Sequence, residues 1–152
     1  MSDPDLPPPP DVGGTSLSGT GTISISAEDD AALCRSTGVE PAGDGTAHPI
    51  WFFVASQVGM GRSVAGICEA CQFDVNDGPM MTGSRVTFSQ PIHTGVAYRV
   101  EGEIKGLTRK RSRTLGVMDL MEYELRLVGA EDDRPVLVTT NSWALPRREL
   151  AA

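Results

Sequence analysis

The hydrophobic residues of this chain follow two patterns that meet near residue 80. Residues 47–73 form a long apolar segment with a helix-like composition, interrupted by Gly59 and Gly61, which are expected to end or kink the helix. From Met81 onward, apolar and polar residues alternate in long runs, as is typical of half-buried β-strands. A helix this apolar must be buried, so the sequence predicts an antiparallel sheet wrapped around one central helix.

Four strands are expected in the second part of the chain. In residues 96–108, apolar residues occupy alternate positions and charged residues lie between them, which predicts one buried face and one exposed face. The polar stretches 108–112 and 129–134 predict hairpin loops, so the last three strands form a meander. The predicted strands are 83–90, 96–108, 113–128 and 135–145.

Before the apolar segment, residues 21–26 alternate with β-branched side chains and predict a short strand. A helix should follow over 27–37, capped by Ser26 and stopped by a glycine. The central helix is expected to begin near Pro49, because proline suits the first helical position. A second helical piece is predicted over 62–72, followed by a turn.

The chain is expected to contain one domain, residues 19–147, between two tails. Its 152 residues, 39% of them hydrophobic, supply one ordinary core. Residues 1–18 are rich in proline and glycine and predict a disordered tail, and 148–152 form a short C-terminal tail. The acidic, proline-rich start does not resemble a secretory signal, so a cytoplasmic location is expected. Polar residues within 47–73 argue against a membrane span.

Composition narrows the classes of partner. A net charge of −7 disfavours nucleic acid and anionic membranes and favours a small organic ligand or another protein. Cys34, Cys68 and Cys71 are interpreted as reduced thiols, and the two histidines lie outside metal-ligand spacing, so no metal site is predicted. The basic run 109–111 is interpreted as a solvated hairpin tip, with docking of a phosphate-bearing cofactor as the alternative.

Four stretches resemble a known family. Residues 24–38 resemble the opening of MaoC-like (R)-specific hydratases, and 47–56 resemble the start of their central helix. Residues 82–95 resemble the strand and Pro-x-x-x-Gly corner of that family and of the related FAS1-like dehydratase domains, and 141–146 resemble the last strand. The resemblance implies a single α+β hot-dog fold. It also implies an acyl thioester of CoA or acyl carrier protein as the substrate, with no further cofactor.

The loop before the central helix departs from that family. Its catalytic members carry G-D-x-N-P-x-H, in which Asp and His activate the water that adds to an enoyl thioester. Here the loop supplies Asp44 and His48 one residue too close together. The resemblance therefore makes His48 and Asp44 the catalytic candidates. It implies a non-catalytic or substrate-shaping subunit that forms a heterodimer with a catalytic MaoC-like chain. The alternatives are a self-sufficient homodimeric hydratase or thioesterase using His48, and a non-enzymatic acyl-thioester-binding module.

Hydration also requires stabilisation of the enolate oxygen. The backbone amides of Ile50 and Trp51 are expected to polarise the thioester carbonyl with the help of the helix dipole. His48 has an alternative role as a helix cap, and Asp44 and His93 have alternative roles as turn or corner residues. A dimer is expected because a single hot-dog leaves one sheet edge unpaired. The substrate-binding candidates are Pro49, Ile50, Trp51, Thr82, Gly83 and His93.

Overall fold

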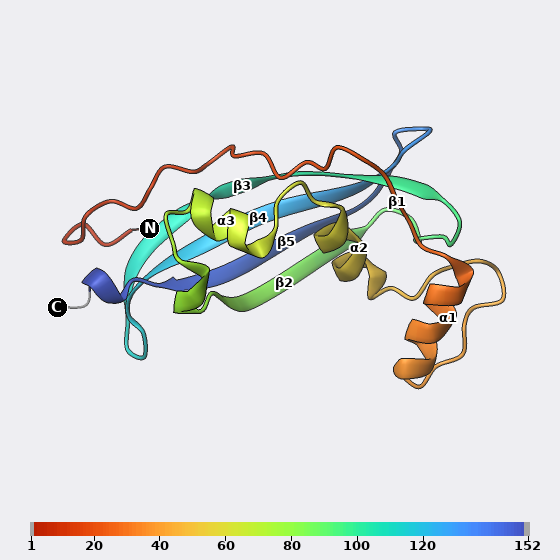
Figure 1. Cartoon of the computed structure of the whole chain (residues 1–152), viewed down its shortest axis with the longest axis horizontal. Coiled ribbons are helices and arrows are strands. Elements are labelled where there is room, and N and C mark those ends of the chain that lie inside the picture. The colour runs from red at the N-terminus through yellow and green to blue at the C-terminus, as the bar shows by residue number, and fades with distance from the viewer. Residues whose placement is uncertain (1, 151–152) are drawn as a thin grey trace.

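The computed structural model describes residues 2–150, which form one five-stranded antiparallel sheet with short helices across one face (Figure 1). This α+β architecture, a curled sheet around a helix, confirms the predicted fold class. The elements in chain order are β1 (Ile23–Ser24), α1 (Ala27–Ser36), α2 (Trp51–Gly59), α3 (Val64–Ala70), the 3-10 helix η1 (Val75–Asp77), β2 (Met80–Phe88), β3 (Ala97–Ser112), β4 (Gly116–Gly129), β5 (Pro135–Pro146) and the 3-10 helix η2 (Arg148–Leu150).

The strands lie in the order β1-β3-β4-β5-β2, and all pair antiparallel. The meander of β3, β4 and β5 is therefore confirmed. The predicted hairpin loop at 108–112 is wrong, because β3 continues to Ser112 and the connection is only 113–115. Arg109 is buried and does not lie at a solvated tip, since its guanidinium donates to both carboxylate oxygens of Asp119 at 2.7 and 2.9 Å.

The helical side of the sheet holds the core. Tyr98, Val100 and Ile104 are buried on β3 as the alternation predicts, and the charged residues between them face the other way. A bulge at Gly106, where φ is 155°, shifts the register between β3 and β4. The alternating pattern thus predicts the correct buried face along most of the strand.

Ser26 caps α1 as expected. The central helix is divided into α2 and α3: α2 ends at Gly59, and Ser63 caps α3 after the break. The break admits another part of the chain, because a Cβ on Gly61 would lie 2.2 Å from the carbonyl oxygen of Ser18. Glycine is required here for the close approach of two backbones.

The sheet covers only part of α2. Its fully buried residues are Ala55 and Ser56, whereas Val58 is 70% exposed. The prediction that this apolar helix is buried within the chain is therefore wrong for its outer face. Within residues 2–150, no helix is long and apolar enough to cross a membrane.

The N-terminal segment, residues 2–19, is not the disordered tail that its composition predicts. It runs along the outer edge of β3 (Figure 1), where Leu17 is 0% exposed and Val12 is buried. The amides of Gly14 and Leu17 donate to carbonyls of β3 at 2.9 and 2.8 Å. The predicted domain start at residue 19 therefore lies inside the packed structure, because these two apolar side chains complete the core.

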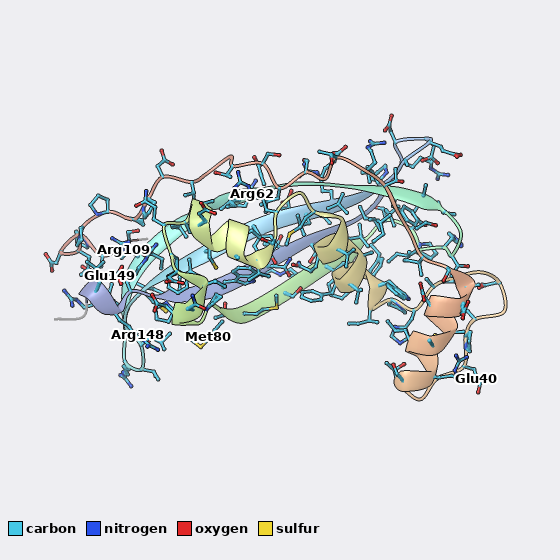
Figure 2. The ribbon with its side chains drawn as sticks, in the orientation of Figure 1. Glu40, Arg62, Met80, Arg109, Arg148 and Glu149 are labelled. Carbon is cyan, nitrogen blue, oxygen red and sulfur yellow. The ribbon has the colours of Figure 1, made fainter. Side chains whose placement is uncertain are left out.

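The C-terminal boundary also lies within packed structure. Arg147 is buried and donates to Asp119 at 2.8 Å, and residues 148–150 form η2. Arg109, Arg148 and Glu149 gather at this end of the molecule, where both termini lie (Figure 2). Residues 151 and 152 of the predicted tail lie outside the described residues.

Candidate functional site

A buried carboxylate anchors the start of α2. Asp30 on α1 is 3% exposed, and its Oδ1 accepts the backbone N–H of His48 at 2.8 Å and the indole N–H of Trp51 at 3.0 Å. Asp30 is one of three acidic residues in the first turn of α1. Nothing in the local sequence distinguishes it from the exposed Asp29 beside it.

His48 holds the turn that leads into α2. Its Nδ1 accepts the backbone N–H of Ile50 at 3.1 Å, and its carbonyl accepts the N–H of Trp51 at 3.1 Å. Both amides therefore have protein partners in the isolated chain, and a role for them towards a thioester carbonyl stays a prediction. In the neutral imidazole, an accepting Nδ1 leaves the proton on Nε2. His48 thus presents a hydrogen-bond donor at its outer nitrogen.

Asp44 is an exposed turn residue. Its Oδ1 accepts the backbone N–H of Thr46 at 3.0 Å, and this hydrogen bond is the main cause of a lowered pKa for the Asp44 carboxyl. A general base is most effective when its pKa lies near the working pH. The environment of Asp44 in the isolated chain moves the pKa of its carboxyl away from that range.

The structure brings His93 close to the Asp44 turn. Thr46 and His93 form an isolated β-bridge, and the nearby Thr94 N–H donates to the carbonyl of Gly45 at 2.9 Å. The backbone N–H of His93 donates to the hydroxyl of Tyr98 at 2.9 Å. His93 therefore helps to fix this corner, and a substrate contact for it stays a prediction.

Thr82 and Gly83 lie elsewhere. The far end of β2 approaches the start of α2, where the rings of Phe52 and Phe88 are 6.3 Å apart. Thr82 is six residues from Phe88 along the same strand, a separation of about 20 Å. Its hydroxyl donates to the carbonyl of Ser142 at 3.1 Å. The structure does not bring these two candidates to the His48 loop, and the role of Pro49 stays a prediction.

A separate apolar pocket, which the sequence did not predict, lies between α2, α3, β2 and β5. Its volume is about 330 Å³. Gln57 supplies an amide to its wall and donates to the hydroxyl of Tyr123 at 3.0 Å. Tyr123 meets Trp143 edge to face at 5.4 Å between ring centroids. The pocket is lined by Phe53, Gln57, Val64, Pro79, Met81 and Trp143.

The cysteines are buried and unpaired with each other. Burial is the main cause that raises the pKa of the Cys71 thiol to about 11, and the neighbouring Cys68 adds to it. A thiol with a raised pKa is a poor nucleophile near neutral pH. Among residues 2–150, no three His, Cys, Asp or Glu side chains gather as a metal site would require.

Comparison with solved structures identifies the hot-dog fold. The chain is similar to the HadBC complex, a (3R)-hydroxyacyl-ACP dehydratase from Mycobacterium tuberculosis, with a TM-score of 0.65 and 9% identity over 90% of this chain and 99% of that one. A monoamine oxidase regulatory protein from Archaeoglobus also has a TM-score of 0.65, with 15% identity over 88% of this chain and 89% of that one. The ChsH1-ChsH2 complex from Mycobacterium tuberculosis gives 0.57, at 13% identity over 87% and 83%. Other similar structures are described as thioesterases.

At these identities the similarity shows the fold alone. No protein-family model and no curated protein matches the sequence. The similar structures include dehydratases and thioesterases, so the choice between these reactions depends on the site itself.

Proposed function

We propose that this chain is the substrate-shaping subunit of a MaoC-like enoyl-thioester hydratase or 3-hydroxyacyl-thioester dehydratase. A partner chain with an intact Asp/His motif supplies the general acid and base. The substrate is an acyl thioester of CoA or acyl carrier protein. This chain contributes part of the acyl-binding surface and the partner interface.

The hydrogen bonding of the His48 loop is the observation that carries the proposal. His48 Nδ1 accepts the Ile50 amide in the turn before α2, and the Asp44 carboxylate accepts the Thr46 amide. Water addition requires a base that can take a proton and a donor for the enolate oxygen. Both side chains hold backbone amides of their own loop, which favours a partner chain as the source of the general acid and base.

The surface around β2 supports association with a partner. β2 forms one edge of the sheet, and its apolar residues Met80, Met81 and Phe88 are all exposed. Met80 lies at the start of the strand, beside Arg148 (Figure 2). Open strand edges and apolar patches of this kind are normally covered by a partner.

Two of the similar structures are complexes between different chains, HadBC and ChsH1-ChsH2. They favour a heterodimer over a homodimer for this chain. The opposite edge of the sheet is less suitable for pairing, because the N-terminal segment already bonds to β3 there.

The test is an assay of crotonyl-CoA hydration by the purified chain, and by the chain co-expressed with a MaoC-like protein that has the intact motif. We expect turnover only from the complex, which should elute as a heterodimer in size exclusion. Robust hydration by the chain alone would contradict the proposal.

A self-sufficient homodimer acting as a hydratase or thioesterase is the second candidate. The half-buried His48 at the start of α2 and the thioesterases among the similar structures favour it. In that case the chain alone is active, and His48→Ala abolishes activity while the protein stays folded.

A further inference from the structure

The segment that carries α1 leaves the sheet and returns to it at one corner. Figure 1 shows α1 projecting from one end of the sheet, beyond the start of α2. The Gly95 N–H donates to the carbonyl of the buried Ile25 at 2.8 Å. The N–H of the buried Ala47 donates to the carbonyl of Ile92, also at 2.8 Å. Both ends of the segment are therefore fixed at the corner that residues 91–95 form.

Between these ends, one carboxylate ties α1 to the rest of the chain. Asp30 and Cys34 are the buried residues of the helix. Asp30 Oδ1 accepts the backbone N–H of His48 and the indole N–H of Trp51, which lie 18 and 21 residues further along the chain. Within the described part of the chain, the other side-chain hydrogen bonds of α1, those of Cys34 and Ser36, stay inside the helix. Asp30 is thus the polar link between α1 and α2.

The two bonds of Asp30 lie on either side of the turn that begins α2. The N-cap residue of this helix, Ile50, has no side chain that bonds to the first turn. Asp30 instead holds the backbone before the turn, at His48, and the ring of the first helical residue, Trp51. A negative charge near a helix N-terminus is also favoured by the helix dipole. A residue distant in sequence therefore fixes the orientation of the turn, where most helices use a local cap.

The outer side of this turn offers groups that suit a thioester. Pro49 and Ile50 are exposed, and Ile50 is 41% accessible. The half-buried His48, whose Nδ1 accepts the Ile50 N–H, carries its donor proton at Nε2. A donor beside apolar side chains matches a carbonyl oxygen that is attached to a hydrocarbon chain. Asp30, only 3% exposed, supports this turn from within the protein.

We propose that Asp30 is a positioning residue for acyl-thioester binding. By holding the His48 amide and the Trp51 indole, it keeps the turn before α2 in the shape that receives the thioester carbonyl, and it does not touch the substrate. The inference rests on the proposed function, in which this chain shapes the substrate site, and it names the residue that sets the shape. Loss of the carboxylate weakens binding of the thioester and leaves proton transfer, which belongs to the partner, unchanged.

The test is calorimetric titration with butyryl-CoA, which has no double bond to hydrate and no hydroxyl to eliminate. The protein is the full chain in complex with the MaoC-like partner, or the full chain alone if no complex forms. Asp30→Asn keeps the shape of the side chain but accepts the two N–H groups more weakly, because the acceptor is neutral. It should raise the dissociation constant at least about fivefold. Asp29→Asn, the same change on the exposed neighbouring residue, is the matched control and should leave the dissociation constant unchanged.

Two further readouts separate positioning from a merely structural role. In crotonyl-CoA hydration by the complex, Asp30→Asn should raise KM and leave kcat within about twofold, as expected when only binding is lost. In the chain alone, the indole N–H of Trp51 should shift its NMR resonance and exchange faster with deuterium in the variant. The indole N–H of Trp143, which is 5% exposed, is the internal reference and should not change.

The possible results divide clearly. A lower urea midpoint with unchanged affinity of the folded protein would overturn the proposal, as would an unresponsive Trp51 resonance or the absence of butyryl-CoA binding. Asp30→Ala removes the acceptor altogether and carries the test if Asp30→Asn does not fold. Binding of butyryl-CoA needs no turnover. Affinity that depends on Asp30 in a complex without hydratase activity would therefore support this inference and contradict the proposed function.

Discussion

Replacement of Asp119 by Asn should destabilise the chain severely. Asp119 is fully buried between Arg109 and Arg147, and it accepts three charge-assisted hydrogen bonds at 2.7, 2.9 and 2.8 Å. Asp119→Asn leaves two buried guanidiniums whose remaining ion pair is the one between Arg147 and the exposed Glu149 at 3.7 Å. Removing one partner of a buried ion pair costs about 3–5 kcal/mol, a large share of the roughly 5–15 kcal/mol stability of an ordinary domain.

The assay is urea unfolding followed by the fluorescence of Trp51 and Trp143. Glu124→Gln on the same strand is the matched control, because Glu124 pairs with Arg126 at 2.8 Å where both side chains are partly exposed. The free energy of unfolding of the control variant should fall by less than about 1 kcal/mol. If the free energies of unfolding of the two variants agree within about 1 kcal/mol, the proposed role of the buried Asp119 is refuted.

Three further predictions concern the N-terminal segment, the helix break and the buried thiol. Leu17→Ala should lower the free energy of unfolding by about 2–5 kcal/mol in urea, because Leu17 is fully buried; a change below about 1 kcal/mol would mean that the segment is detached in solution. Gly61→Ala should destabilise the chain more than Gly21→Ala, measured by thermal melting, because only the first Cβ collides with Ser18. The free energy of unfolding should fall between pH 9 and 11, since Cys71 keeps its proton in the folded state up to a pKa of about 11 but loses it near 9 when unfolded. Cys71→Ala should reduce that fall by about 2–3 kcal/mol. An unchanged dependence of the free energy of unfolding on pH would disprove the raised pKa of Cys71.

Much of the fold could be predicted because local patterns decide it. Alternating apolar residues place β3, β4 and β5 and give the buried face, and Ser26 marks the start of α1. The errors concern contacts distant in sequence. Arg109 looks like part of a polar loop until Asp119 is placed opposite it. Leu17 looks like an isolated apolar residue in a proline-rich tail until β3 provides an edge for it.

The candidate site was predicted less well. The sequence locates the loop that begins the central helix, but it does not show which hydrogen bonds the loop already makes. Asp30 lies 18 residues before His48 and holds its backbone, which no local pattern indicates. The pocket beside Gln57 depends on three separate segments meeting at α2, so it became visible only in the folded chain.

The central claim is that the partner, not this chain, supplies the acid and base. The most direct measurement is the crotonyl-CoA hydration rate of the co-expressed complex carrying His48→Ala in this chain, compared with the unmodified complex. Our account predicts kcat within a few-fold of the original, because His48 holds the turn before α2 and does not transfer the proton. General acid–base catalysis contributes about 10²–10⁴-fold, so a loss of that size in a folded, correctly assembled complex would contradict the account.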